Sequence, residues 1–296
     1  MPQPKQSAPK PAARQTPPKK GGSKPDIGSF GGLVLALAGI MGGLMIEGGK
    51  VSDISQVTAA MIVLGGTFGA TMISTPFSTL LGALRRLPSV FFEGSMAADA
   101  MVEEIIGYAT KARKNGIVAL ESEAEAIADP FLRKALNLAV DGTDLQELRK
   151  MMELEIAVEE QRGEAEAKVF ESAGGFAPTI GIIGAVLGLI QVMKHLANIE
   201  EVGRGIAVAF VATVYGVGVA NILLLPAATK IKARIKRQTD LKELILEGVG
   251  GIVEGLNPKL VRSKLEAYTR EQASAKPSKA KPDAKAKAAQ AEPAKA

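Results

Sequence analysis

The sequence predicts an all-helical membrane protein that crosses the bilayer four times and carries a helical insert on the cytoplasmic side. Four long windows contain no Asp, Glu, Lys, Arg or His; they are Ile27 to Ile46, Ile54 to Leu84, Ser172 to Met193 and Gly205 to Thr229. About 20 apolar residues suffice to cross a bilayer, so each window can form a transmembrane helix. Hydrophobic residues make up 47% of the chain and aromatic residues only 4%. Apolar residues that are mostly small or aliphatic, as here, are typical of packed membrane helices.

The first two transmembrane helices are expected within residues 27–84. Residues 1–26 are rich in Pro, Lys, Gln, Ser and Ala and lack apolar periodicity, which predicts a disordered arm. The apolar run after this arm is longer than the core of a signal peptide, and no small-residue cleavage site follows it, so we expect a retained helix. The second window is longer than a bilayer requires, and we expect its membrane part to begin near Val57.

The positions of Lys and Arg predict the orientation, because cytoplasmic loops carry an excess of these residues. Basic residues are frequent in the N-terminal arm, follow the second span at Arg85 and Arg86, and follow the fourth span between Lys230 and Arg237. The two short loops carry few of them. We therefore expect a multi-pass protein with both termini and the middle segment in the cytoplasm. Charges flanking the spans account for the net charge of +5, so no nucleic-acid binding is expected.

The cytoplasmic segment 85–171 is charged and has helical periodicity. Asp129 before Pro130 predicts a capped helix start with proline in the first turn. Asp141-Gly142 predicts a turn, and Thr143 with Gln146 fits a capping box that opens the next helix.

A long helix is expected from about Asp144, because few helix breakers occur as far as Phe170. Its continuation into the third span would join the cytoplasmic domain to the membrane region mechanically. Spans three and four occupy residues 172–229. Amphipathic helices are expected in 230–268, and the Ala/Lys/Pro composition of 269–296 predicts a disordered tail.

The third span carries glycines on one helical face. Gly181, Gly184 and Gly188 are spaced i, i+3 and i+7, so their missing side chains leave a smooth stripe. Such a stripe lets a neighbouring helix approach closely. We predict that this face packs closely against a partner helix.

The side chains exclude most catalytic chemistry, and we expect no enzyme, cofactor or metal site. The chain has no cysteine and a single histidine, His195, which rules out disulfides, thiolate catalysis, multi-histidine metal sites and a Ser-His-Asp set. Gly48-Gly49-Lys50 lacks the first glycine and the following Ser or Thr of a phosphate loop. The acidic residues between Glu121 and Asp129 lack the spacing of a calcium loop, which favours a solvated helix face.

No ionisable side chain is expected at membrane depth, although an ion path normally needs one. The spans offer only neutral polar groups; they are Thr67, Thr71, Ser74, Thr75, Thr179, Thr213, Tyr215 and Asn221. Most of these are expected to bond to helix backbones. If the protein conducts protons, another chain must therefore supply the carboxylate.

Four ordered segments resemble the MotA family, which includes the sodium-type PomA. These segments are Ala112 to Glu121, Ala177 to Leu189, Gly205 to Thr213 and Glu254 to Pro258. The resemblance covers about residues 27–267, and ExbB and TolQ, with three spans, fit less well. It implies a flagellar motor stator subunit in the bacterial inner membrane. Such chains form a pentamer around a dimer of MotB, whose transmembrane aspartate binds the ion and whose peptidoglycan-binding domain anchors the unit.

The resemblance also implies roles for individual residues. Pro178 and Pro226 match the prolines that couple ion passage to movement, and Thr213 matches a threonine near the ion path. Thr179 lies beside Pro178, where the path meets the long helix. Ala185 stands where sodium-driven relatives often have threonine, which favours protons as the transported ion.

The resemblance matches Arg113 and Glu121 to the charged pair that engages the rotor protein FliG, and Lys114 is expected to assist them. On composition alone these would be ordinary exposed charges. Two other interpretations stay open. The chain can belong to a stator that powers gliding, outer-membrane energisation or defence, or it can be a membrane scaffold that conducts nothing.

Overall fold

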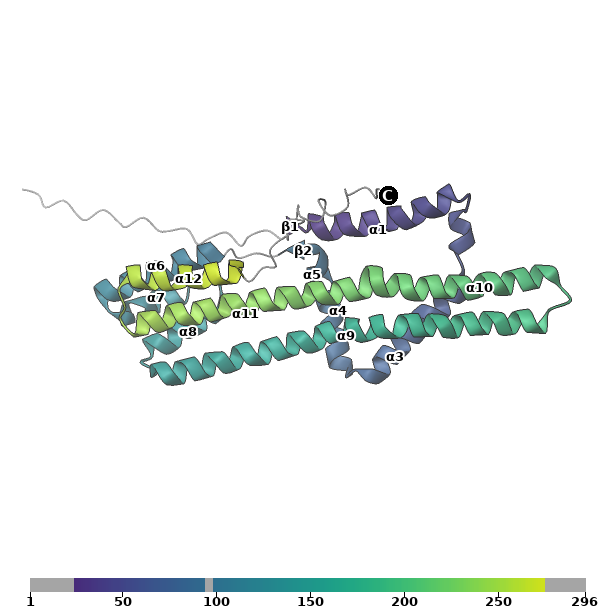
Figure 1. Ribbon diagram of the computed structural model, residues 1–296. Coiled ribbons are helices and arrows are strands. Elements are labelled where there is room, and N and C mark those ends of the chain that lie inside the picture. The colour runs from purple at the N-terminus through teal and green to yellow at the C-terminus, as the bar shows by residue number, and fades with distance from the viewer. Residues whose placement is uncertain (1–23, 94–97, 275–296) are drawn as a thin grey trace, which may run out of the picture.

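A pair of long antiparallel helices forms the backbone of the fold (Figure 1). The computed structural model describes residues 24–93 and 98–274. Helix α9 (Leu145–Lys194) runs for 50 residues without a break. The chain then returns alongside it through α10 (Ile199–Gly218), the π-helical segment η4 (Val219–Leu224) and α11 (Leu225–Val253). The long helix expected from about Asp144 is confirmed, and it passes directly into the third span.

Four helical stretches are long and apolar enough to cross a membrane, which confirms the predicted all-helical class. The first is α1 (Ile27–Ile46), and the third and fourth lie within α9 and within α10 to α11. The second spans residues 57–74 and comprises α2 (Val57–Ala60), the π-helical turn η2 (Met61–Gly65) and α3 (Gly66–Ser74). A 3₁₀ turn, η1 (Val51–Ile54), connects α1 to it.

The second charge-free window forms two helices instead of one. Helix α3 ends at Ser74, and α4 (Phe77–Arg86) begins after the extended residues Thr75 and Pro76. Proline lacks a backbone N–H and disfavours the helical conformation in the residue before it, so the break falls at this point. In Figure 1, α4 crosses the long helices instead of following them.

The segment that the sequence predicts to be cytoplasmic folds as a helical domain, named the cytoplasmic domain after that prediction, at the end of the molecule remote from the α9–α10 turn (Figure 1). Helix α5 (Pro88–Phe91) precedes this domain and packs its Val90 against α4, α9 and α11. The elements of the domain itself are α6 (Ala98–Asn115), η3 (Ile117–Leu120), α7 (Glu121–Ala124), α8 (Pro130–Val140) and α12 (Pro258–Ser274). Their apolar faces close over the ends of α9 and α11 to form one core. Its fully buried members include Met101, Ile105, Leu132, Leu136, Leu148, Met152, Leu244 and Leu265.

The helix starts agree with the sequence at one site and differ at another. Asp129 caps α8 by accepting the Leu132 N–H at 2.9 Å, with Pro130 in the first turn, as predicted. At the start of α9 the predicted cap Thr143 is wrong, because Asp144 accepts the Gln146 N–H at 2.9 Å. The Thr143 N–H instead bonds to the Leu138 carbonyl at 3.1 Å and so closes the end of α8.

Part of each predicted disordered end is ordered. Strand β1 (Lys24–Pro25) pairs antiparallel with β2 (Phe92–Glu93). Asp26 caps α1 and forms ion pairs with Lys230 and Arg234 of α11; the Lys230 ammonium lowers the pKa of Asp26 to about 2. Helix α12 includes residues 269–274 of the predicted tail. The rest of the arm and of the tail lies outside the described residues.

Candidate functional site

The glycine face of the third span packs against α10 of the same chain. A Cβ atom added at Gly181 would lie 2.9 Å from the Ala212 carbonyl oxygen, and one at Gly188 would lie 2.7 Å from the Gly205 carbonyl oxygen. At Gly184 the added atom would meet the Ala212 side chain at 2.8 Å. The helix that these glycines admit is therefore α10 of the same chain, and the ring around another protein stays a prediction. The short turn between α9 and α10 places the backbone of α10 directly against this face.

Helix α10 contributes two glycines that the sequence reasoning did not single out. A Cβ at Gly216 would lie 2.5 Å from the Ala177 carbonyl oxygen, and one at Gly205 would lie 3.0 Å from the Gly188 carbonyl oxygen. Both glycines lie in the fourth charge-free window, so their spacing was visible in the sequence. Together with the glycines of α9 they hold the two spans at backbone contact.

The two prolines lie in the same section of the helix pair. Pro178 is inside α9, where its nitrogen cannot donate the helical hydrogen bond to Gly174. Pro226 stands in the first turn of α11, directly after the π-helical segment η4. A Cβ at Gly174 would lie 2.6 Å from the Leu225 side chain, next to Pro226. Missing and shifted backbone hydrogen bonds are therefore concentrated here, and such positions permit helix bending.

The candidate polar groups near these prolines bond to their own helices. The half-buried Thr213 donates its hydroxyl to the Ala209 carbonyl at 3.2 Å, and the exposed Thr179 donates to the Phe176 carbonyl at 2.8 Å. Asn221, within η4, donates to the Val217 carbonyl at 2.9 Å. A threonine hydroxyl used in this way keeps an accepting lone pair for water or for a partner. Threonine and asparagine side chains stay neutral, and residues 172–193 and 205–229 contain no Asp, Glu, Lys, Arg or His.

Arg113, Lys114 and Glu121 lie on either side of a sharp turn in the cytoplasmic domain. Gly116, with φ of 82°, reverses the chain between the last turn of α6 and η3, which leads to Glu121 at the start of α7. All three side chains are exposed, and within the described residues none of them forms an ion pair or hydrogen bond. They remain available to a charged partner.

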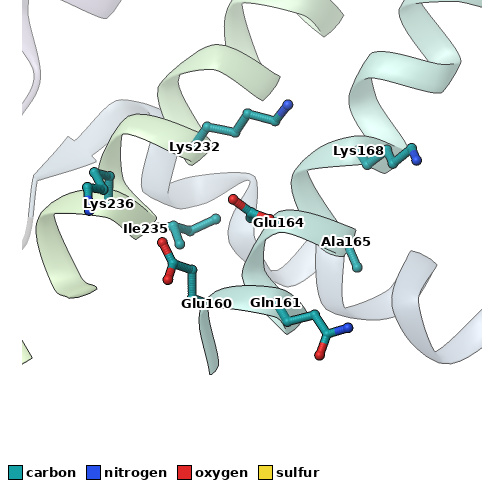
Figure 2. A pocket seen from close by; sticks show the side chains of 8 residues that line it. All are labelled: Glu160, Gln161, Glu164, Ala165, Lys168, Lys232, Ile235 and Lys236. Carbon is teal, nitrogen blue, oxygen red and sulfur yellow. The ribbon is translucent and has the colours of Figure 1, made fainter. Parts of the chain in front are cut away.

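A mixed-charge groove of about 430 Å³ lies between α9 and α11, beyond the charge-free sections of the two helices. Figure 2 shows its lining side chains; they are Glu160, Gln161, Glu164, Ala165, Lys168, Lys232, Ile235 and Lys236. Lys232 is paired with Glu171 at 2.7 Å and Lys236 with Asp240 at 3.1 Å. Among the described residues no cluster of three or more His, Asp or Glu side chains could hold a metal ion.

Comparison with known proteins matches nearly the whole described chain. The family described as motility protein A N-terminal matches residues 30–115, and the MotA/TolQ/ExbB proton channel family matches residues 123–244. Motility protein A of Bacillus subtilis is 34% identical over 248 residues, which cover 82% of this chain and 90% of that protein. This chain belongs to the motility protein A (MotA) family.

Other MotA-family relatives and structures agree. Motility protein A of Helicobacter pylori is 33% identical, covering 82% of this chain and 95% of that protein. Among solved structures, C. jejuni MotAB matches with a TM-score of 0.78 and 32% identity, covering 82% of this chain and 95% of that chain. The flagellar MotAB stator complex of Bacillus subtilis matches with a TM-score of 0.76 and 32% identity, covering 84% and 99%. The MotA-type fold is thus shown at the level of both sequence and structure.

Proposed function

We propose that this chain is a flagellar stator subunit that, with a MotB-type partner, conducts protons across the bacterial inner membrane and converts the flow into torque on the rotor. Its relatives are named motility protein A, and two similar structures are MotAB complexes. The observation that carries the proposal is α9, which runs without a break from charge-free membrane spans into the domain that presents Arg113 and Glu121. A continuous helix of this kind can carry movement from one region to the other.

The lack of an ionisable group in the spans supports a two-chain ion path. The partner supplies the titrating aspartate and a peptidoglycan-binding anchor, and several copies of this chain, in a pentamer, surround it. Pro178 and Pro226 permit the helix pair to bend, while Thr179 and Thr213 offer hydroxyls near the path. Arg113, Lys114 and Glu121 engage the charged surface of the rotor protein FliG. With this orientation both chain termini lie in the cytoplasm.

Swimming assays on a deletion strain complemented with variants test the ion path. Pro178→Leu and Thr213→Val should lower swimming speed while fluorescently tagged stators still assemble. The exposed neighbour Ile182→Leu is a matched control that should swim normally. Normal swimming of both path variants would refute the conduction role, and a deletion strain that swims normally would refute the flagellar assignment.

Charge reversal tests the rotor contact separately. Arg113→Glu should reduce motility without loss of membrane assembly, because it reverses a charge that faces the rotor. Lys150→Glu makes the same charge change at another exposed site in the cytoplasmic domain and should have little effect. Equal motility of the two variants would remove Arg113 from the contact.

A further inference from the structure

The second span and the following helix α4 together contact α9 on both sides of Pro178. On the membrane side, a Cβ at Gly66 of α3 would lie 2.7 Å from the Ile180 side chain, and the Ile62 side chain lies 3.3 Å from the Cβ position of Gly184. On the cytoplasmic side, Leu80 and Ala83 of α4 share a buried cluster with residues of α9 that precede Pro178. One continuous segment of chain therefore bridges the proline.

This bridging segment has a joint of its own. Between α3 and α4, Thr75 and Pro76 are extended, with φ, ψ of −136°, 135° and −57°, 138°. The joint lies close to the level at which α9 contains Pro178, since its two flanking helices contact α9 above and below that residue. This joint and the missing hydrogen bond at Pro178 are therefore positioned to move together.

An ion pair holds the cytoplasmic end of α4 against α9. Glu166 of α9 is 4% exposed and is the only acidic or basic residue among those described that is buried. Its carboxylate pairs with Arg86 at the end of α4 and lies 3.3 Å from the Arg162 Nε. A buried charge is retained only when it is paired and hydrogen-bonded, so the position of α4, which carries Arg86, is tied to Glu166.

The backbone of α4 presses on the same carboxylate. A Cβ at Gly82 would lie 2.3 Å from the Glu166 Oε1 and 2.9 Å from its Cδ. Glycine at this position allows α4 to cover the ion pair. Gly82, Arg86 and Glu166 thus form one contact, about 18 Å along α9 from Pro178 at 1.5 Å per residue.

We propose that the contact of Gly82, Arg86 and Glu166, called the clamp below, holds α4 against α9 so that the α3–Pro76–α4 segment limits bending of α9 at Pro178. Glu166 is the positioning residue of the clamp. Bending of α9 at Pro178 then requires a matching change at Thr75 and Pro76, and the clamp sets how far α9 bends. The inference rests on the proposed function, in which bending at Pro178 couples ion passage to movement.

The geometry of the clamp can be tested without motility. The chain lacks cysteine, so Ser78→Cys on α4 and Ala165→Cys on α9, both at exposed positions, allow spin labels at only these sites. Labelled chains are diluted with unlabelled ones in the full complex, and the distance distribution is measured by pulsed electron resonance. Glu166→Gln should broaden or shift the distribution, because it removes the charge while keeping the shape.

Two glycine variants provide a second route and a matched control. Gly82→Ala retains all the charges but displaces the carboxylate, so it should change the distribution in the same way. Gly69→Ala on α3 should leave it unchanged, since no atom lies within 4 Å of the added methyl group. Gly82→Ala also covers the case in which Glu166→Gln fails to assemble. An unchanged distribution in an assembled Glu166→Gln or Gly82→Ala complex overturns the clamp.

A double-mutant cycle tests whether the clamp acts through Pro178. Motor speed is measured for Glu166→Gln, Pro178→Ala and the double variant. If the clamp acts through the bend, the double variant is no slower than Pro178→Ala, so the two effects depart from independence by about twofold or more. Independent effects would mean that Glu166 only supports the fold. If Pro178→Ala leaves motor speed unchanged, the proposed function fails while the distance measurement still reports on the clamp.

Discussion

Gly216→Ala should separate the third and fourth spans. The added methyl carbon would lie 2.5 Å from the Ala177 carbonyl oxygen, whereas ordinary contact begins at 3.4 Å, so the helices must part by about 0.9 Å at this point. Ala177 offers a backbone atom, which cannot turn away as a flexible side chain would. Overpacking of this kind costs about 1–3 kcal/mol, and the opened gap forfeits about a quarter to a half of the dispersion energy of the atoms it separates. We expect a loss near the upper end of that range.

Thermal unfolding of the purified complex in detergent measures this loss. The control is Gly218→Ala, two residues along the same helix, where no atom lies within 4 Å of the new methyl group. There alanine should stabilise the helix by about 0.5–1 kcal/mol, because glycine is a poor helix former. Gly216→Ala should lower the Tm and Gly218→Ala should not. A Tm for Gly216→Ala as high as that of Gly218→Ala would refute the argument that backbone contact sets the spacing of the spans.

Three further changes test other parts of the molecule. Gly116→Ala places a side chain at φ of 82° in open space, so strain of about 1–2 kcal/mol should reduce swimming without loss of assembly, whereas Gly107→Ala in α6 should not. Asp26→Asn should lower the Tm at pH 7, because the pKa of Asp26 is lowered from 3.8 to about 2 and its ionised form therefore stabilises the fold. This stabilisation is full above pH 3.8, so the difference in Tm between variant and parent should shrink as the pH falls towards 2. Leu136→Ala, at a fully buried position, should destabilise the cytoplasmic domain by about 2–5 kcal/mol in thermal unfolding, whereas the exposed Val118→Ala should have little effect; equal Tm values would place Leu136 outside the core.

The four spans could be predicted because a bilayer penalises charge whatever the tertiary structure. The break at Pro76 was less visible, since a window without charges says nothing of backbone direction. Similarly, adjacent Thr143 and Asp144 can both cap a helix, and the choice depends on the Thr143 N–H, which α8 uses. That bond follows from how α8 ends, which residue types alone do not reveal.

The same limit on what the sequence can predict applies to the site residues. The spacing of Gly181, Gly184 and Gly188 indicated close approach, but a smooth face does not identify the helix that covers it. The structure shows that α10 does so, through Gly205 and Gly216. The ion pair of Arg86 and Glu166 joins positions 80 residues apart, and only the crossing of α4 over α9 brings them together. An ion pair that depends on such a crossing of helices can be identified only once the fold is known.

The uninterrupted course of α9 has a consequence for the scale of motion. From Pro178 to its start at Leu145 the helix is about 50 Å long, at 1.5 Å per residue. A rotation of about 5° at Pro178 would therefore carry the cytoplasmic end through about 4 Å, somewhat less than the pitch of about 5.4 Å of one helical turn. Leu148 and Met152 anchor that end in the core of the cytoplasmic domain, so the domain would travel with it. Because this section of α9 acts as a lever, a small force on the domain would produce a large bending moment at Pro178.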